Sequence, residues 1–324
     1  LAAGIPDTVP CTTVNKVCAS GMKTITLGAQ TIVAGDNHAV VVGGMENMSQ
    51  VPHYIDGRNG VKFGNITLLD GITKDGLLDV YSNVPMGTCA ELCAKEYGIT
   101  REDQDNFAIT SYQRATEAWD AGKFNEEVVP VSIPQRKGDP IQFSKDEFIK
   151  PNTSMEGLAK LRPAFKKEGS VTAGNASGLN DGAAATIIAS EEAVKKYNLK
   201  PLARIVSSAV VGVEPRIMGI GPVEATNKAL AKAGLTLDQI DIIELNEAFA
   251  AQALACTRAW GIPDNDPRLN PNGGSIAIGH PLGVTGARIA YSAALELQIT
   301  GKRYALITMC IGVGQGYAAI IERV

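Results

Sequence analysis

The chain has 324 residues, of which 45% are hydrophobic and 20% charged, and its formal net charge at pH 7 is −4. This length and composition predict a globular α/β protein of about two domains and exclude a disordered, collagenous or coiled-coil structure. Lysines and arginines are interspersed with acidic residues, so the basic stripe of a nucleic-acid-binding protein is excluded. Without an apolar run of ~18 residues or a signal peptide, the sequence predicts a cytoplasmic protein with no membrane partner, with the mitochondrial matrix or another organelle as the alternative.

The first predicted elements are a short strand over Thr12–Asn15, a helix over about Gly21–Ala34 and a strand over His38–Val42. From about Asn47 to Thr172 the composition shifts toward Gly, Asp, Asn, Lys and Pro, and the predicted strands become brief. We interpret this stretch as an inserted lid, because long insertions in compact domains are usually functional. Its main element is an amphipathic helix over Arg101–Ala121 with Thr100 as N-cap and with Phe107, Tyr112, Ala115 and Trp119 on its apolar face.

A buried strand over Asp181–Ile188 is predicted to resume the core, and helices and strands alternate from Leu202 onward. This alternation predicts a largely parallel sheet with helices on both faces, and the short turn before the last strand predicts an antiparallel hairpin. The predicted elements are the strand Ala203–Ser208, a helix from Pro222 to Gly234, the strand Ile240–Leu245, a helix from near Asn246, the strand Ser275–Ile278, a helix from about Thr285 to Leu297, and the strands Tyr304–Ile311 and Tyr317–Glu322.

The two ends of the chain form an imperfect repeat of strand, helix and strand. Cys18 and His280 take equivalent places in the two copies, where the first strand turns into the helix. The second copy is preceded by a stretch of roughly 70 residues from Arg204 to Ser275, and the first copy has no counterpart of it. If the halves are copies, we expect two βα units to be missing in front of Leu1.

These patterns predict three parts. Residues 1–48 and 173–199 are expected to form an N-terminal half that is incomplete at its start. Residues 49–172 are expected to form the lid inserted into it, and residues 200–324 the C-terminal half.

The six cysteines are too few and too scattered for a disulfide framework, so reduced thiols are expected. Cys89 and Cys93 lie four residues apart on one face of a predicted helix, which is the spacing of half a metal site. Zinc requires further ligands, and the three histidines form no such cluster, so we interpret both as buried hydrophobic residues and expect no metal.

Cys18 follows Val17 at the start of a predicted helix, where unpaired N–H groups and a partial positive charge favour a thiolate. The alternative is a buried structural cysteine. His280, between Gly279 and Pro281 at the equivalent turn, can supply the base that a nucleophilic cysteine needs, and a capping or core histidine is the alternative.

Cys310 ends an apolar strand and is followed by Gly312, Gly314 and Gly316, whose backbone N–H groups can hold an oxyanion. A dinucleotide-binding loop would need a helix after the glycines, whereas a closing strand follows. Asn246 lies just beyond a predicted strand and is either an ordinary N-cap or a functional amide. Its place at the carboxyl end of a parallel strand favours the functional amide.

Five blocks follow one another along the chain: Val17–Gly21, Gly174–Gly182, Asn246–Phe249, Gly279–Pro281 and Cys310–Gly312. In this order they resemble the signature of the thiolases, specifically of the acetyl-CoA acetyltransferase branch, and the likeness runs from Leu1 to Val324. The resemblance implies a five-layered αβαβα fold of two pseudo-repeated mixed-sheet halves with an inserted lid that receives coenzyme A. The implied reaction is 2 acetyl-CoA ⇌ acetoacetyl-CoA + CoA, with CoA as substrate or product and no metal or redox cofactor.

By similarity, Cys18 is the nucleophile that accepts the acetyl group, His280 activates it, and Cys310 is the second acid/base. Asn246 holds a water that forms one oxyanion hole with His280, and the N–H groups of Cys18 and Gly312 form the other. Condensing two thioesters needs a nucleophile, a base and two sites for negative charge, which this set provides. The residues implied to bind CoA or line its slot are Ser177, Met86, Lys150, Phe165, Leu179, Met218, Ala248 and Phe249.

The chain departs from the family pattern at Pro85, where many relatives have His, and at Val313, where biosynthetic relatives often have Gly. The alternatives are a longer-chain or branched 3-ketoacyl-CoA thiolase and a truncated pseudo-thiolase that binds acyl-CoA without turnover. A decarboxylating ketoacyl synthase is disfavoured, because such enzymes lack a second catalytic cysteine. The resemblance also implies a homodimer or homotetramer, which we expect to pair through Pro10–Asn15.

Overall fold

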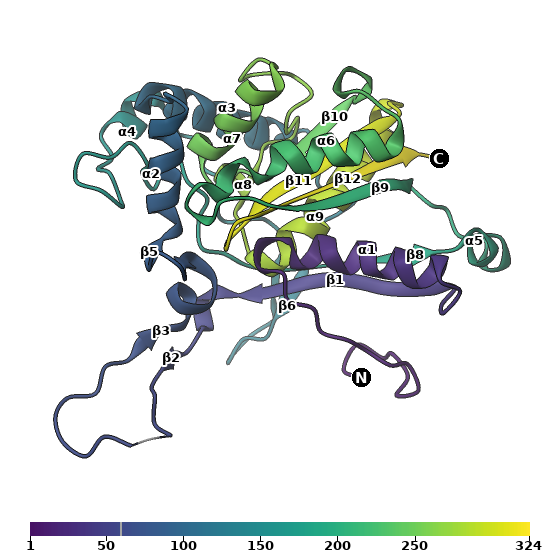
Figure 1. Ribbon diagram of the computed structural model, residues 1–324. Coiled ribbons are helices and arrows are strands. Elements are labelled where there is room, and N and C mark those ends of the chain that lie inside the picture. The colour runs from purple at the N-terminus through teal and green to yellow at the C-terminus, as the bar shows by residue number, and fades with distance from the viewer. Residues whose placement is uncertain (59) are drawn as a thin grey trace.

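Two sheets with a pair of helices between them form the framework of the molecule (Figure 1). The computed structural model describes residues 1–58 and 60–324. The first sheet pairs β1 (Ala39–Asn47) with β8 (Asp181–Ala189), and α1 (Ser20–Val33) and α9 (Leu282–Thr300) separate it from the second sheet. The second sheet has the strand order β10 (Ile242–Leu245), β11 (Tyr304–Ile311), β12 (Gln315–Arg323) and β9 (Ala203–Gly212), and α6 (Gly221–Ala233) packs on its other face.

The side chains of β11 alternate between two cores, because successive residues of a strand point to opposite faces. Ala305 and Ile307 pack with Ile289 of α9, whereas Leu306 packs in the core that contains α6 and α7 (Ala250–Trp260). Burying a single Leu or Ile side chain contributes ~1.5–3 kcal/mol, so this central strand ties the layers together. The expectation of helices on both faces is confirmed for this sheet.

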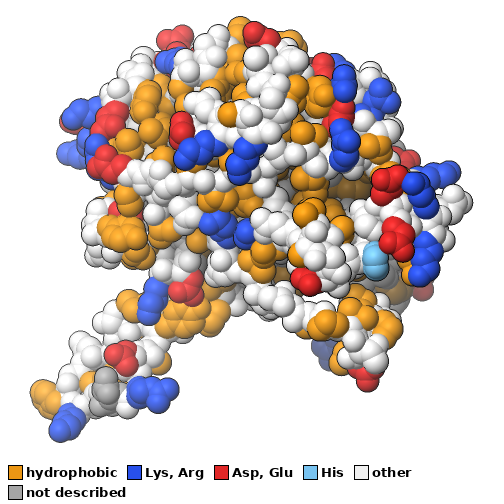
Figure 2. Space-filling model, turned by 45° about the vertical axis from the view of Figure 1, so that its right-hand side comes forward, with side chains coloured by type: hydrophobic (Ala, Val, Ile, Leu, Met, Phe, Trp, Pro, Cys, Tyr) orange, Lys and Arg blue, Asp and Glu red, His pale blue; other side chains and the backbone are white. Residues whose placement is uncertain are grey.

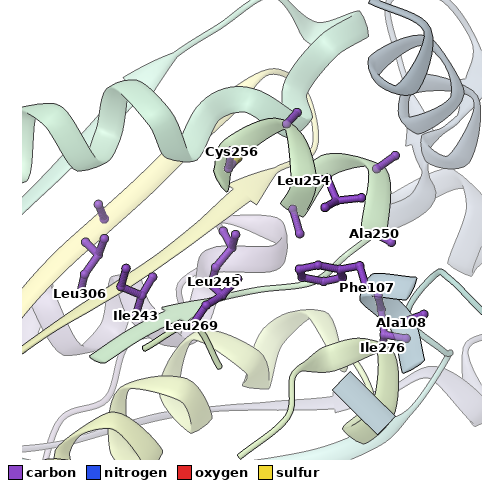
Figure 3. Close-up of a cluster of buried hydrophobic side chains, with 14 of the residues drawn as sticks. Phe107, Ala108, Ile243, Leu245, Ala250, Leu254, Cys256, Leu269, Ile276 and Leu306 are labelled. Atoms are coloured by element: carbon purple, nitrogen blue, oxygen red, sulfur yellow. The ribbon is translucent and has the colours of Figure 1, made fainter. Parts of the chain in front are cut away.

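The residues of the predicted lid, 49–172, pack onto the same core. Helix α3 (Arg101–Asp120) begins with the predicted N-cap, because the Thr100 hydroxyl accepts a hydrogen bond from the N–H of Asp103, whose carboxylate accepts one from the N–H of Thr100. Figure 3 shows Phe107 of α3 beside Leu254 of α7. The lid also contains α2 (Met86–Glu96), α4 (Met155–Ala159) and the strand pairs β2 (His53–Tyr54) with β3 (Leu69–Asp70), β4 (Leu78–Asp79) with β5 (Val84–Pro85), and β6 (Val131–Ile133) with β7 (Ile141–Phe143).

The segment between β2 and β3 forms an arm that extends away from the body (Figure 1). Figure 2 shows hydrophobic side chains along this arm and at its end. Phe63 is 99% exposed there, and Leu68 is exposed nearer the body. The arm therefore contributes little to the core of the chain.

Two predicted strands are wrong. Thr12–Asn15 forms no strand, since none of the described residues pairs with it, and most of it is exposed. The expected strand for self-association over Pro10–Asn15 is therefore not present either. Ser275–Ile278 forms the short helix α8 instead of a strand. A short apolar run fits a buried helix as well as a strand, so periodicity alone could not distinguish them.

Three further predictions need correction. The four-stranded sheet is not largely parallel, because only β10 and β11 pair in parallel while β11–β12 and β12–β9 are antiparallel. Strand β8 is half-exposed rather than buried, since α1 and α9 cover one of its faces and no helix covers the other over residues 1–58 and 60–324. Helix α7 begins at Ala250 and not near Asn246, because Phe249 is extended and bridges to Ala176.

Other boundaries agree more closely with the sequence. Helix α1, the end of α6 at Gly234 in the left-handed conformation, and the β11–β12 hairpin are confirmed. Helix α9 begins at Leu282, three residues before the predicted start. The remaining helix, α5 (Glu191–Tyr197), follows β8.

Gly44 of β1 lies against the first turn of α9, where a Cβ atom would overlap the carbonyl oxygen of Gly283. Gly44→Ala is therefore expected to lower the free energy of unfolding by about 2 kcal/mol, because the backbone of the turn must shift. Urea denaturation checks this. In the control Gly57→Ala, the added Cβ meets open space and the change should stay within about 0.5 kcal/mol. Equal stability of the two variants would contradict the prediction.

Candidate active site

His280 lies in the turn before α9, and its imidazole ring is buried. Its Nδ1 atom lies 2.6 Å from Oγ1 of Thr285, and the Thr285 hydroxyl donates to the carbonyl oxygen of Pro281 at 3.0 Å. Because that hydroxyl hydrogen is engaged, Thr285 Oγ1 must accept the bond from a protonated Nδ1. Nε2 of His280 therefore carries no proton, and its lone pair can act as a base.

Asn246 directly follows β10 and faces the imidazole. Its Nδ2 atom lies 3.3 Å from Nε2 of His280, and its Oδ1 atom accepts a 2.6 Å hydrogen bond from the hydroxyl of Ser275. The N–H of Asn246 donates to the carbonyl oxygen of Thr308 on β11 at 3.0 Å. The amide is thus held on both sides, at the carboxyl ends of β10 and β11.

Cys18 lies in a single 3₁₀ turn (Val17–Ala19) directly before α1, and the backbone N–H groups of Gly312 and of Cys18 itself act to lower the pKa of its thiol. Helices α1 and α9 approach closely near their N-termini, because a Cβ on Gly286 would lie 2.5 Å from the backbone nitrogen of Met22. Cys18 also packs in a small buried cluster with Leu282, two residues after His280. The packing of α1 on α9 thus brings together the predicted nucleophile and base.

Cys310 lies at the end of β11, and the following turn leads into β12. Burial raises the pKa of Cys310 well above its usual value, and the nearby Cys18 raises it further. At Gly312, a Cβ would lie 3.6 Å from the sulfur of Met86 and 3.8 Å from Cγ1 of Val17. The turn after Cys310 therefore lies between the Cys18 segment and the lid helix α2.

The Cys18 thiol and the His280 imidazole are both uncharged at neutral pH. Burial raises the pKa of Cys18 to about 11, although the N–H group of Gly312 lowers it. Burial, together with the charge of Arg288, lowers the pKa of His280 to about 3. The expectation that the helix N-terminus favours a resting thiolate is therefore corrected, because burial outweighs the helix dipole. A thiolate must form by transfer of the Cys18 proton.

Four of the predicted slot residues gather at Cys310. Met86, Met218 and Ala248 form a buried cluster with it, and Phe249 packs against this cluster. The structure thus brings these four predicted residues to one of the two thiols, Cys310.

Two more of the predicted residues adjoin this cluster. The Phe165 ring meets the Phe249 ring edge-on with centroids 6.2 Å apart. Ser177 donates from both its N–H and its hydroxyl to the carbonyl oxygen of Ala248, at 3.1 Å each. Phe165 and Ser177 therefore extend the cluster away from Cys310.

Lys150 and Leu179 do not join the cluster. Lys150 Nζ lies 4.7 Å from the centroid of the Phe148 ring, and that ring lies against Gly178. Leu179 is 58% exposed. Both residues therefore lie at the outer end of the predicted slot, on the two sides of Gly178.

The family comparison shows to which protein family the chain belongs. The model described as "Thiolase, N-terminal domain" matches residues 1–192, and "Thiolase, C-terminal domain" matches residues 199–323. The chain belongs to the thiolase family. As a thiolase it is an acyltransferase, which confirms the enzyme class expected from the sequence.

Relatives of this thiolase include a beta-ketoadipyl-CoA thiolase of Acinetobacter baylyi, 53% identical over 330 residues, and an acetyl-CoA acetyltransferase of Chromobacterium violaceum, 52% identical over 326 residues. Each match covers 100% of this chain and 82% of the relative. Among solved structures, human mitochondrial 3-ketoacyl-CoA thiolase and the Bacillus anthracis acetyl-CoA acetyltransferase both match with TM-score 0.96, at 46% and 42% identity, over 100% of this chain and 81% of theirs. The expected thiolase fold is confirmed.

The remaining thiols of this thiolase are buried except for Cys11, and all six cysteines are free. Burial raises the pKa of Cys89 to about 11 and that of Cys93 to about 12.

In the part of the chain that the structure describes, no group of three or more His, Cys, Asp or Glu side chains is placed to hold a metal ion. Within the same residues, no helix is long and apolar enough to cross a membrane.

Sequence reasoning missed the polar side chains that hold the site in place. Besides Thr285 and Ser275, these are Asn180, whose Oδ1 accepts from the N–H of His280 at 3.2 Å, and Glu247. The buried Glu247 carboxylate accepts hydrogen bonds from the hydroxyl of Ser111 at 2.7 Å, from Nδ2 of Asn270 at 2.7 Å and from the N–H of Ile276 at 3.1 Å. The only signal for Asn180 and Glu247 was their place inside motif blocks.

Glu244 on β10 is a buried acid whose protonation links stability to pH. Burial raises its pKa from 4.5 to about 8. The folded chain therefore keeps a proton that the unfolded chain releases above pH 4.5, so stability falls as the pH rises from 4.5 to 8, by about 1.4 kcal/mol per pH unit. Glu244→Gln, which stays neutral at every pH, is expected to remove this loss.

Urea unfolding of the two proteins at pH 6.5 and pH 8 tests the effect of Glu244. Between these pH values the variant should gain about 2 kcal/mol relative to the unaltered protein. The control is Glu224→Gln on the exposed side of α6, which should leave the pH dependence unchanged. Parallel pH profiles for the unaltered protein and Glu244→Gln would refute the prediction.

Proposed function

We propose that this thiolase is an acetyl-CoA C-acetyltransferase that interconverts two acetyl-CoA with acetoacetyl-CoA and CoA. The observation that carries the proposal is the pair of buried thiols, Cys18 and Cys310, close enough for Cys18 to raise the pKa of Cys310, in a site whose histidine has an unprotonated Nε2. An acyl-enzyme and a carbanion must both form in this chemistry, and one thiol cannot hold the acyl group and also transfer the carbon-bound proton. Two thiols that share one base meet that requirement.

In the thiolysis direction, the Cys18 proton moves to Nε2 of His280 and the thiolate attacks the 3-keto carbon of acetoacetyl-CoA. The N–H groups of Cys18 and Gly312, which act on the pKa of the thiol, can then stabilise the oxyanion. The C2–C3 bond then breaks, leaving an acetyl group on Cys18 and the enolate of acetyl-CoA. A water held by Asn246, together with the protonated His280, stabilises that enolate.

Cys310 donates its proton to C2 of the enolate, which releases the first acetyl-CoA. The raised pKa of Cys310 supports this role, because it keeps the thiol protonated until the carbanion forms. Incoming CoA gives its thiol proton to Cys310, and the CoA thiolate attacks the acetyl group. Cys18 leaves as a thiolate and recovers its proton from His280, so every group returns to its starting state. Condensation is the reverse sequence.

We propose that residues 49–172 form the lid that receives the CoA, inserted between residues 1–48 and 173–199. The pairing of β1 with β8 supports this division, because it joins the two segments that flank the insertion. In this arrangement Met86, Met218 and Ala248 lie around the acyl group. The pantetheine arm runs past Ser177 and the two aromatic rings of Phe165 and Phe249, with Leu179 and Lys150 toward the nucleotide.

The apolar lining around the acyl group supports an uncharged group such as acetyl. The side chains that surround Cys310 there, Met86, Met218 and Ala248, are apolar. The alternatives are a longer-chain or branched 3-ketoacyl-CoA, or a carboxylate-bearing one such as the name of the Acinetobacter relative indicates. The complete set of Cys18, His280, Asn246 and Cys310 supports turnover rather than binding alone.

The test is an assay of purified protein with CoA and a series of 3-ketoacyl-CoA substrates. Acetoacetyl-CoA should lose its enolate absorbance, and its kcat/KM should exceed that of longer, branched and carboxylate-bearing 3-ketoacyl-CoAs. A higher kcat/KM for one of those would replace the proposed substrate, and no turnover of any of them would refute the function.

We also propose that the protein is a homodimer or homotetramer and that it acts in the cytoplasm or an organelle. Light scattering on the purified protein measures the number of copies.

A further inference from the structure

The hydrogen bonds at the base run in one direction through four side chains. The Ser275 hydroxyl donates to Asn246, Nδ2 of Asn246 donates to Nε2 of His280, and Nδ1–H of His280 donates to Thr285. The Thr285 hydroxyl closes the row by donating to the carbonyl oxygen of Pro281. All four side chains are buried, so water does not compete for these bonds.

The Asn246 amide is the group in this row of hydrogen bonds whose orientation could reverse. The two ends of an asparagine amide have nearly the same shape, so packing does not decide which end faces the imidazole. If the amide turned over, its Oδ1 atom would face the lone pair of Nε2, and two acceptors would oppose each other. The Nε2 lone pair therefore favours the NH2 end, and the Ser275 hydroxyl, 2.6 Å from Oδ1 on the far side of the amide, donates the second hydrogen bond that holds this orientation.

We propose that Ser275 is a positioning residue that fixes the Asn246 amide with its NH2 group toward His280 and the reacting carbonyl. The role in turnover rests on the proposed function, whereas the orientation itself does not. With the amide held this way, its N–H is available to the water of the oxyanion hole without a rearrangement during the reaction. Ser275 touches no reacting atom and acts entirely through Asn246.

Ser275 is held rigidly enough for this role. It is the first residue of α8, and the Glu247 carboxylate accepts from the N–H of Ile276, the next residue. Ile276 and Leu245, which is the residue before Asn246, both point into the core shown in Figure 3. The donor and the amide are therefore anchored in one packed core, so the separation between them is fixed by both elements.

The first test is Ser275→Ala in the assay with acetoacetyl-CoA. We expect kcat to fall about tenfold while KM for acetoacetyl-CoA changes less than about twofold, because the bond acts on the transition state and not on CoA binding. The control is Ser292→Ala on α9, which removes a buried hydroxyl with the same 2.6 Å bond length, to Glu127, far along the helix from His280. It should keep kcat within about twofold.

A double-mutant cycle with Asn246→Ala separates positioning from general damage to the fold. Asn246→Ala alone should lower kcat about 10²-fold, and adding Ser275→Ala should cost less than about twofold more. A further tenfold loss in the double variant would show that Ser275 acts independently of Asn246 and would overturn the proposal. Ser275→Thr keeps the hydroxyl and should restore most of the kcat that Ser275→Ala loses.

A spectroscopic test addresses the orientation without any turnover. In protein labelled with ¹⁵N-asparagine, the NH2 signals of Asn246 are those that disappear in Asn246→Ala. They should shift in Ser275→Ala and stay in place in Ser292→Ala, and unshifted signals in Ser275→Ala would overturn the proposal. If the unaltered protein showed no thiolysis, the proposed function would fail, while these signals would still decide whether Ser275 positions Asn246.

Discussion

Cys18→Ala is expected to lower the thiolysis of acetoacetyl-CoA by at least about 10⁴-fold, because the covalent acetyl intermediate cannot form without the sulfur. The loss should appear in kcat, while binding of CoA stays within about twofold, since the apolar slot around Met86 and Phe249 is unchanged. Steady-state kinetics measure the first effect, and calorimetric titration with CoA measures the second.

The matched control for Cys18→Ala is Cys11→Ala, which replaces an exposed cysteine of the same N-terminal region. It should retain full activity, and intact-protein mass spectrometry after incubation with acetyl-CoA should show one acetyl group on it and none on Cys18→Ala. Thiolysis at a preserved rate in Cys18→Ala would remove Cys18 from the mechanism. An acetyl group on a different residue would identify another nucleophile.

The residues that we propose to react could be singled out from the sequence because their local setting is distinctive. Cys18 and His280 each precede a helix, and Cys310 ends an apolar strand before a glycine-rich turn. Each of these settings depends on a few neighbouring residues, so the order of motifs was enough to find them. The approach of α1 to α9 at Gly21 and Gly286 then followed from small residues near the helix starts.

The supporting structure was not predictable in the same way. The run Ser275–Ile278 is a helix because the Glu247 carboxylate, distant in sequence, accepts a hydrogen bond at its first turn. Whether the four-stranded sheet is parallel depends on which strand pairs with β9. Strand β9 pairs with β12, and the two strands are antiparallel. Such choices are made by long-range contacts, and a local pattern does not contain them.

The charge states of the site also depend on the whole fold. A helix N-terminus predicts a lowered pKa for Cys18, but burial raises it to about 11. The same burial lowers the pKa of His280 to about 3, so the pair rests as thiol and neutral imidazole. The sequence identified the two partners, whereas their protonation follows from how deeply the surrounding layers enclose them.

Cys310→Ala is expected to separate the two halves of the reaction. Turnover of acetoacetyl-CoA should fall about 10³-fold, because no group remains to transfer the proton at C2. Acetylation of Cys18 by acetyl-CoA should persist within about tenfold, since Cys18 and His280 remain and a thiolate is a good leaving group that can depart without a proton from Cys310. Mass spectrometry of the acetyl-enzyme and steady-state assays measure the two effects.

Proton exchange makes the role of Cys310 specific. In D2O, the unaltered protein should exchange the α-protons of acetyl-CoA, and Cys310→Ala should not, because the enolate forms only when a base removes that proton. The control is Cys256→Ala, which removes another fully buried sulfur but one that donates to the carbonyl oxygen of Gly219. Its exchange should match that of the unaltered protein. Persistent exchange in Cys310→Ala would assign the carbon acid step to a different base, and His280 would then have to serve both the nucleophile and the carbanion.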